Sequence, residues 1–165
     1  MNKNRKFIVY IGLGSNKNNP KEQLQNALKE IKKKITVIKE SSVYETEPVG
    51  NGTKNFYNMV IKAETELSPY ALLDLLMKIE ASFGRNRKKE KRWGDRVLDL
   101  DILNYQDIIM NDYRLTLPHR EMFNRIFVLE PFLEIEPNAK ILNKDMAKRL
   151  TILKRVKEYY IEKKA

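Results

Sequence analysis

The sequence predicts an α+β fold, in which an antiparallel sheet carries helices packed on one of its faces. Three observations lead to this prediction. Four segments have the composition of strands, and two of them, residues 55–66 and the run from Val97 onward, alternate apolar and polar residues. Two segments place apolar residues at helical spacing and have a proline near their first residue. A loop rich in glycine and proline joins the second and third strands, which is typical of an antiparallel hairpin.

The first part of the chain predicts a strand followed by a helix. The strand covers residues 6–13 and ends around Gly12 and Gly14, where a tight turn and a close approach of the backbone to a ligand are both open explanations. Asn19 is the expected N-cap of the helix and Pro20 its first residue. The helix runs to about Lys34, and its expected buried stripe consists of Leu24, Ala27, Leu28, Ile31 and Ile35.

The middle of the chain predicts the hairpin and a second helix. The two strands of the hairpin cover residues 35–44 and 55–66. Ser68 is the expected N-cap of the helix, and Pro69 is its first residue. The helix ends at Gly84, and its buried face consists of Leu72, Leu73, Leu76 and Ile79.

The last part of the chain begins with a basic loop, residues 85–96, which leads into an apolar strand from Val97 onward. A short edge strand is expected at residues 108–109, and a helical turn that ends near Pro131. An amphipathic helix from Asn143 closes the chain, with apolar residues Met146, Leu150, Leu153, Val156 and Tyr160. The resulting order is β-α-β-β-α-β with extra C-terminal helices, which is the ferredoxin-like plan.

Length and composition favour one domain over residues 1–165, with residues 143–165 as a C-terminal helical extension. Apolar residues make up 42% of the chain and charged residues 33%, which is typical of a folded domain. The chain contains no cysteine, no signal-peptide pattern and no apolar run of membrane-spanning length. We therefore expect a cytoplasmic protein without a membrane partner.

The net charge of +10 predicts an anionic partner such as a nucleotide, a polyphosphate or a nucleic acid. Part of this charge is less specific, because the lysines of residues 29–34 and of the C-terminal segment are typical of solvated helix faces. The sequence has no G-x-x-x-x-G-K-[ST] motif, so a P-loop is excluded. A bound phosphate would therefore need other side chains.

Asp99 and Asp101 provide the most informative chemical pattern. They lie two residues apart in an apolar strand, so both carboxylates face the same side, roughly 6.6 Å apart along the strand. Carboxylates in such a strand need neutralisation, either by a divalent cation such as Mg²⁺ or by arginines. Residues 85–96 include seven Lys or Arg and two acidic residues. Paired carboxylates beside many arginines are what a metal–polyphosphate site requires.

Several motifs make the sequence resemble the 6-hydroxymethyl-7,8-dihydropterin pyrophosphokinase family of folate biosynthesis. The most specific are Arg92-Trp93-Gly94-x-Arg96-x-Leu98-Asp99-Leu100-Asp101-Ile102 and Leu115-x-Leu117-Pro118-His119, and residues 11–16 and 56–58 support them. The resemblance implies transfer of the β,γ-pyrophosphate of ATP to the hydroxymethyl group of a reduced pterin, with release of AMP. It also implies two Mg²⁺ ions as cofactors and a monomeric enzyme that binds no nucleic acid.

The same resemblance implies a role for each site residue. The Mg²⁺ ligands are Asp99 and Asp101, and the catalytic arginines are Arg85, Arg92 and Arg96. The residues expected to bind the nucleotide are Glu80, Arg87, Ile102, Arg114, Thr116, His119 and Arg125. The residues expected to bind the pterin are Thr46, Val49, Phe56, Asn58, Trp93 and Phe127. Aromatic rings would stack on the flat pterin, and the amide of Asn58 would form hydrogen bonds with its polar edge.

Other interpretations stay open at this point. The positive charge and the ferredoxin-like plan also suit a nucleic-acid-binding module. Against this, the strand that would carry stacking aromatic residues carries Asp99 and Asp101 instead. In an inactive homologue, these carboxylates would only pair with arginines, and His119 would be a structural residue. The sequence does not identify a general base for the substrate hydroxyl.

Overall fold

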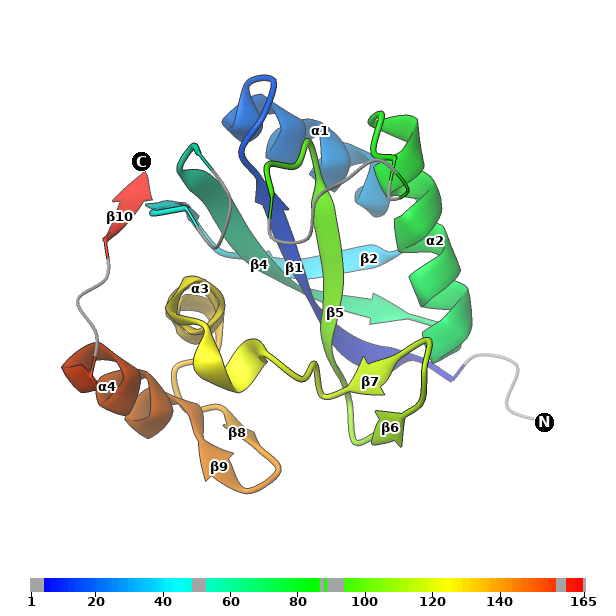
Figure 1. Ribbon diagram of the computed structural model, residues 1–165. Coiled ribbons are helices and arrows are strands. Elements are labelled where there is room, and N and C mark those ends of the chain that lie inside the picture. Colours follow the sequence, from blue (N-terminus) through cyan, green and yellow to red (C-terminus); the bar gives the residue numbers. More distant parts are fainter. Residues whose placement is uncertain (1–4, 49–52, 87, 89–93, 157–159, 165) are drawn as a thin grey trace.

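The structure of the chain is a computed structural model that describes residues 5–48, 53–86, 88, 94–156 and 160–164. Its main sheet has six strands, all paired antiparallel, in the order β10-β3-β4-β1-β5, and β2 also pairs with β4. The central strand β1 (Phe7–Ser15) lies between β4 (Phe56–Thr65) and β5 (Asp99–Tyr105) (Figure 1). The predicted α+β fold with an antiparallel sheet is confirmed.

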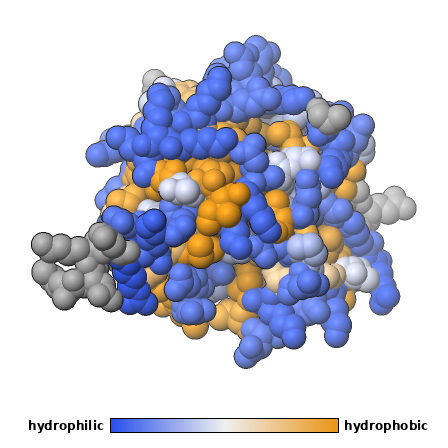
Figure 2. Space-filling model, turned by 180° about the vertical axis from the view of Figure 1, so that it is seen from behind, coloured by the Kyte–Doolittle hydropathy of each residue, from blue (hydrophilic) through white to orange (hydrophobic). Residues whose placement is uncertain are grey.

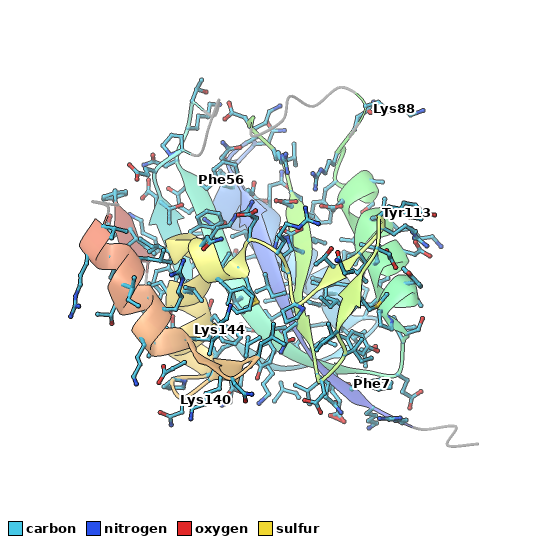
Figure 3. All side chains as sticks on the ribbon, turned by 60° about the horizontal axis from the view of Figure 1, so that its bottom comes forward. Phe7, Phe56, Lys88, Tyr113, Lys140 and Lys144 are labelled. Carbon is cyan, nitrogen blue, oxygen red and sulfur yellow. The ribbon has the colours of Figure 1, made fainter. Side chains whose placement is uncertain are left out.

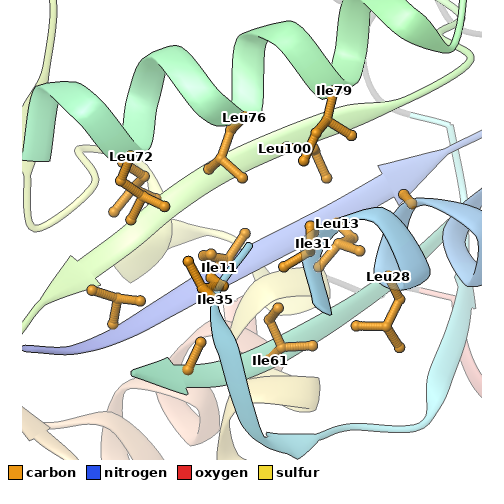
Figure 4. Packing of buried hydrophobic residues seen from close by; sticks show 14 of the residues in the cluster. Ile11, Leu13, Leu28, Ile31, Ile35, Ile61, Leu72, Leu76, Ile79 and Leu100 are labelled. Carbon is orange, nitrogen blue, oxygen red and sulfur yellow. The ribbon is translucent and has the colours of Figure 1, made fainter. Parts of the chain in front are cut away.

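Two helices, α1 (Pro20–Lys32) and α2 (Pro69–Ser82), cover one face of this sheet (Figure 4). They bury Leu24, Ala27, Leu28, Ile31, Leu72, Leu76 and Ile79 against sheet residues that include Ile11, Leu13, Ile61 and Leu100. Full burial of one such side chain stabilises the fold by about 1.5–3 kcal/mol. The apolar spacing in the sequence therefore identified the main core correctly.

The two helix starts differ in how they are capped. The hydroxyl of Ser68 accepts a hydrogen bond from the backbone N–H of Ala71 at 3.2 Å, as predicted. Asn19 stands at the N-cap position of α1, but its side chain makes no capping hydrogen bond, so this part of the prediction was wrong. Its φ of 59° is a left-handed conformation that asparagine tolerates better than most residues.

The strand predicted for residues 35–44 is divided into β2 (Thr36–Glu40) and β3 (Val43–Thr46), which pair with successive parts of β4. The reason lies at Ser41. Its hydroxyl accepts a hydrogen bond from the backbone N–H of Val60 at 2.9 Å, and its own N–H donates to the Val60 carbonyl at 2.9 Å. The Ser41 hydroxyl thus takes the place of a backbone carbonyl as the acceptor for Val60, and the strand is interrupted at this point.

On the opposite face of the sheet lie η1 (Met122–Asn124) and α3 (Ile126–Ile135), and α4 (Met146–Val156) packs against these two (Figure 1). The predicted helical turn does not end at Pro131, because α3 continues beyond it. Six of its ten residues are buried, including Pro131 itself and Phe132 after it, and this burial outweighs the missing backbone hydrogen bond. Helices therefore lie on both faces of the sheet.

Two short hairpins accompany the sheet. The first consists of β6 (Met110–Asn111) and β7 (Thr116–Leu117), so the edge strand predicted at residues 108–109 lies two residues later. The second consists of β8 (Lys140–Ile141) and β9 (Lys144–Asp145), with Leu142 and Asn143 at positive φ in its turn. The C-terminal helix therefore begins at Met146 rather than at Asn143, since the preceding residues form this hairpin.

The predicted C-terminal helix also ends earlier than expected. Residues 161–164 form β10 (Ile161–Lys164), which pairs antiparallel with β3 and places Ile161 opposite Thr46. Tyr160 is therefore outside the helix that its spacing suggested. The C-terminal segment adds an edge strand to the main sheet.

Hydrophilic side chains cover most of the face opposite the view of Figure 1 (Figure 2). Lys140 and Lys144 of the β8–β9 hairpin are both exposed, and Figure 3 shows Lys140 at the lower edge of the molecule. Among the residues that the structure describes, none forms a helix long and apolar enough to cross a membrane.

Candidate active site

The floor of the candidate site is formed by three neighbouring strands on the face that α3 partly covers. In the antiparallel register, Gly14 of β1 is paired with Asn58 of β4 and with Asp99 of β5. Gly12 is paired in the same way with Asp101. Directly paired residues point to the same face, so on this face the positions of β1 beside Asp99 and Asp101 have no side chain. The turn explanation for the glycines was therefore wrong, because β1 continues through both of them.

Gly14 has little room for a larger residue. A Cβ atom at this position would lie 2.8 Å from Oδ1 of Asn58. The amide of Asn58 is also held from the other side, because its Nδ2 donates to Oγ1 of Thr46 at 3.1 Å. Both side chains are buried, so the amide of Asn58 has a defined orientation beside the carboxylates.

Asp99 is neutralised by two arginines. Nη1 of Arg85 lies 2.8 Å from Oδ1 of Asp99, and Nη1 of Arg96 lies 3.5 Å from Oδ2. Arg85 also pairs with Glu80, whose carboxylate accepts the backbone N–H of Leu100 at 2.9 Å. Glu80 is buried beneath the site and lines neither of the cavities described below, so it orients Arg85 in this structure.

Asp101 has a different environment. Burial, followed by the negative charge of Asp99, raises the pKa of Asp101 to about 7. The nearby positive charge of Arg125 opposes this shift only in part. A cation bound beside Asp101 would therefore favour its ionised form.

His119 faces Asp101, with Nε2 of the ring 3.9 Å from Oδ1 of the carboxylate. The other ring nitrogen, Nδ1, accepts a hydrogen bond from the backbone N–H of Glu121 at 3.1 Å. Burial lowers the pKa of His119, and the charge of Arg125 lowers it further. The ring is therefore neutral at pH 7 with its proton on Nε2, which makes it a hydrogen-bond donor directed into the site.

Two cavities meet at these residues, because Asp101 and His119 line both of them. The first has a volume of about 300 Å³ and the second about 390 Å³. The predicted residues in the first cavity are Thr46, Phe56, Asn58, Arg85, Arg96, Asp99, Arg125 and Phe127. The predicted residues in the second are Ile102, Arg114 and Thr116. The expected pterin residues that the structure describes all line the first cavity, whereas the expected nucleotide residues are divided: three line the second, His119 lines both, Arg125 lines the first and Glu80 lines neither.

Arg114 illustrates how the second cavity is lined. Its guanidinium pairs with Asp74 at 2.6 Å and lies over the ring of Tyr70, 5.0 Å from the centroid. In the first cavity, Arg125 lies over the ring of Phe127 at 5.5 Å.

Four other predicted site residues lie outside the described residues, and these are Val49, Arg87, Arg92 and Trp93.

Sequence reasoning missed several residues of the site. The sequence analysis did not identify Gly12 and Gly14 as part of the site. Their spacing of two residues matches that of Asp99 and Asp101, and this signal could have indicated that the four residues share one face of the sheet. Asn16, Thr53 and Asp95 also form a hydrogen-bonded cluster beside the first cavity, which no sequence pattern indicated. Within the described residues, no group of three or more His, Asp or Glu side chains could hold a metal by itself.

A family model described as 7,8-dihydro-6-hydroxymethylpterin-pyrophosphokinase (HPPK) matches residues 10–137. The chain belongs to the HPPK family. It is 46% identical over 144 residues to the 2-amino-4-hydroxy-6-hydroxymethyldihydropteridine pyrophosphokinase of Haemophilus influenzae, covering 82% of this chain and 89% of the relative. The Bacillus subtilis protein of the same name is 42% identical over 131 residues, covering 78% of this chain and 77% of that protein.

Solved structures agree on the fold. The crystal structure of Plasmodium falciparum wild-type HPPK-DHPS with pterin and p-hydroxybenzoate superposes with a TM-score of 0.73 at 16% identity. The match covers 94% of this chain but only 45% of the Plasmodium chain, so this protein spans less than half of that one. The likeness therefore concerns the HPPK fold.

Proposed function

We propose that the two cavities hold the two substrates of one reaction, in which the β,γ-pyrophosphate of ATP passes to the hydroxymethyl group of 6-hydroxymethyl-7,8-dihydropterin. The chain belongs to the HPPK family, so it is an ATP-dependent pyrophosphokinase of folate biosynthesis. The observation that supports the residue assignment is the carboxylate pair, of which Asp101 lines both cavities and Asp99 lines the first with arginines beside it.

The pterin belongs in the first cavity under this proposal. Phe56 and Phe127 offer aromatic faces for a flat ring. Trp93, which precedes β5 in the sequence, is proposed to contribute a further one. Asn58 offers a fixed amide for the polar edge of the ring, because Thr46 holds its orientation. We also assign Val49 to this cavity, since it belongs to the segment that joins Thr46 to Phe56 in the sequence.

ATP belongs in the second cavity, with its phosphate chain directed toward Asp101. The backbone of Ile102 and the side chains of Arg114 and Thr116 would hold the nucleoside part. His119 donates from Nε2 at the junction and can bind a phosphate oxygen there. Arg85 and Arg96 lie beside Asp99 and are proposed to bind the phosphates. Arg87 and Arg92, from the segment between α2 and β5, are proposed to assist them.

Asp99 and Asp101 fit Mg²⁺ as ligands. Mg²⁺ is usually held by one or two carboxylates together with substrate phosphates and water, so a larger cluster of acidic residues is not needed. Burial and, second to it, the charge of Asp99 raise the pKa of Asp101, so a cation bound here would stabilise its ionised form. When bound, two ions would neutralise charge on the transferred phosphates. Which carboxylate binds which ion stays a prediction.

The reaction needs no protein nucleophile. The oxygen of the substrate hydroxymethyl group attacks the β-phosphorus of ATP, the bond between that phosphorus and the α,β-bridging oxygen breaks, and AMP leaves. The hydroxyl proton passes to solvent or to a base that the structure does not identify. Arg85 and Arg96 act by positioning phosphate oxygens and by stabilising their charge in the transition state. We further propose that the enzyme is a cytoplasmic monomer, and that its strand order is that of the ferredoxin-like plan.

Separation of the products tests this function directly. Purified protein is incubated with ATP, Mg²⁺ and the hydroxymethyl dihydropterin, and nucleotides and pterins are resolved by chromatography. We expect AMP and a pyrophosphorylated pterin in equal amounts. Formation of ADP would mean transfer of a single phosphoryl group, and would reject the proposed bond cleavage.

A further inference from the structure

A hydrogen-bonded cluster beside the first cavity joins three segments that are far apart in the sequence. It consists of Asn16 at the end of β1, Thr53 in the loop before β4, and Asp95 in the loop before β5. Asp95 lines neither cavity, whereas its neighbours Gly94 and Arg96 both line the first. The cluster therefore lies directly behind a wall of the site.

Asp95 accepts three hydrogen bonds in this cluster. Its Oδ1 accepts the backbone N–H of Thr53 at 3.0 Å and the Nδ2 amide of Asn16 at 2.7 Å. Its Oδ2 accepts the hydroxyl of Thr53 at 2.8 Å. An ionised carboxylate suits these three donors, because both of its oxygens only accept hydrogen bonds. Although burial opposes it, the hydrogen bonds from Thr53 and Asn16 hold the pKa of Asp95 below its ordinary value.

Asn16 connects this carboxylate to the backbone of Arg96. Its Oδ1 accepts the N–H of Arg96 at 2.6 Å, and its own backbone N–H donates to the Arg96 carbonyl at 2.9 Å. Asn16 is almost fully buried, so the geometry of these contacts is well defined. The guanidinium of Arg96 then reaches Asp99 at 3.5 Å. A displacement of Asp95 would therefore shift the side chain of Asn16, and with it the backbone of Arg96.

We propose that Asp95 is a positioning residue for the transfer reaction. It fastens the loop before β4, which leads to Phe56 and Asn58, to the loop before β5, which carries Arg96. This sets the position of Arg96 relative to a pterin bound on β4. The inference rests on the proposed function, because it assigns Asp95 an effect only through the role of Arg96 in pyrophosphate transfer.

A comparison of kcat in two backgrounds tests the proposal. Asp95→Ala should lower kcat by roughly 10- to 100-fold, since small misplacements of a catalytic group have effects of this size. In an Arg96→Ala background the same substitution should cause little further loss, because the group that Asp95 places is already absent. Equal losses of kcat in both backgrounds would overturn the proposal, as would wild-type kcat for Asp95→Ala.

Two further variants separate positioning from folding. Thr53→Val removes only a hydroxyl from an exposed residue, and should cause a smaller loss of kcat that does not add to that of Asp95→Ala. Asp107→Ala changes an exposed aspartate in the turn after β5 and should leave kcat unchanged. If Thr53→Val and Asp95→Ala lower kcat independently of each other, the proposal is overturned.

The wild-type enzyme distinguishes failure of this inference from failure of the proposed function. Absence of AMP from the wild-type reaction would reject the function, and the inference with it. If the wild type forms AMP but Arg96→Ala retains full kcat, the function stands and the positioning role of Asp95 is overturned.

Discussion

At the scale of single residues, the site depends on the absence of a side chain at Gly14. A methyl group at Gly14 would lie 2.8 Å from Oδ1 of Asn58, so Gly14→Ala should displace the amide that we assign to the pterin. We expect the KM for the pterin to rise about 10-fold or more, as for loss of one well-oriented hydrogen bond to a ligand, with a smaller change for ATP.

Gly12→Ala is the matched comparison, because its Cβ would meet only the Leu103 side chain at 3.5 Å or more. It should change the pterin KM less than Gly14→Ala does. Steady-state kinetics with each substrate varied in turn would measure both effects. Equal effects of the two substitutions on the pterin KM would mean that the contact with Asn58 is not the reason for the glycine.

Asp101 illustrates a conflict between stability and activity at the same scale. Its ordinary pKa of 3.8 is raised to about 7 in the fold, so the unfolded chain loses the proton first. The folded state is therefore destabilised progressively as pH rises from about 4 to 7, and remains so above pH 7. Asp101→Asn removes this charge, and should raise the Tm of the ligand-free protein at pH 8 by about 2–4 °C.

The same substitution should lower kcat/KM on the order of 1000-fold, because metal charge stabilisation is worth several kcal/mol. Calorimetry at pH 8 and at pH 4 measures the rise in Tm caused by Asp101→Asn, which should be smaller at pH 4. A variant with higher Tm and normal turnover would show that Asp101 is costly to the fold but not needed for the metal.

At the scale of secondary-structure elements, β10 lies on the edge of the sheet beside the first cavity. It pairs with β3, whose Thr46 holds Asn58, and Lys164 pairs with Glu45 at 2.9 Å. Deletion of residues 160–165 should therefore loosen β3. We expect the pterin KM to rise about 5- to 10-fold, equivalent to roughly 1 kcal/mol, while the KM for ATP changes little.

A double substitution, Lys163→Ala with Lys164→Ala, is the control for this deletion, because it removes the two positive charges of β10 and keeps its backbone hydrogen bonds. It should retain most of the affinity for the pterin. An unchanged pterin KM after the deletion itself would contradict a role for β10 in the site.

The helix α3 is fastened to β3 by Glu134. Its carboxylate accepts hydrogen bonds from the hydroxyl of Tyr44 at 2.5 Å and from the N–H of Ser42 at 3.0 Å. Burial raises the pKa of Glu134, but the bonds from Tyr44 and Ser42 outweigh it and hold the pKa below the ordinary 4.5. Glu134 therefore stabilises the fold above about pH 4.5, and this contribution is lost as pH falls through its folded pKa.

Glu134→Gln should reduce the free energy of unfolding at pH 7 by about 1–2 kcal/mol, the usual contribution of hydrogen bonds to a charged group. Near pH 3 the wild type and the variant should have similar stability. Urea unfolding at both pH values tests this. The same difference in stability at pH 3 and pH 7 would mean that the ionised carboxylate is not what matters.

At the scale of the whole molecule, the sequence predicted the features that depend on local patterns. Alternation in the strand after Val97 correctly placed Asp99 and Asp101 on one face. Helical spacing identified the faces of α1 and α2, and the motifs identified the family. These succeed because helix and strand periods determine which side chains share a face.

The features that it missed depend on contacts between distant segments. The register between β1, β4 and β5 turns two glycines into the floor of a site, and nothing local to residues 12–14 shows this. The four residues of β10 include three charged ones, so their strand conformation depends on pairing with β3. The hydrogen bonds of Asp95 likewise join segments that are about 40 and 80 residues away in the chain.

The central claim is that Asp99 and Asp101 lie between a pterin cavity and a nucleotide cavity. A crystal structure with the hydroxymethyl pterin, Mg²⁺ and an ATP analogue tests it most directly. The analogue should have a methylene group between the α- and β-phosphorus atoms, because that is where the bond breaks. We expect the pterin beside Asn58, the nucleoside near Ile102 and Thr116, and the phosphates and Mg²⁺ at Asp99 and Asp101. A pterin or a phosphate chain bound away from this carboxylate pair would contradict the claim.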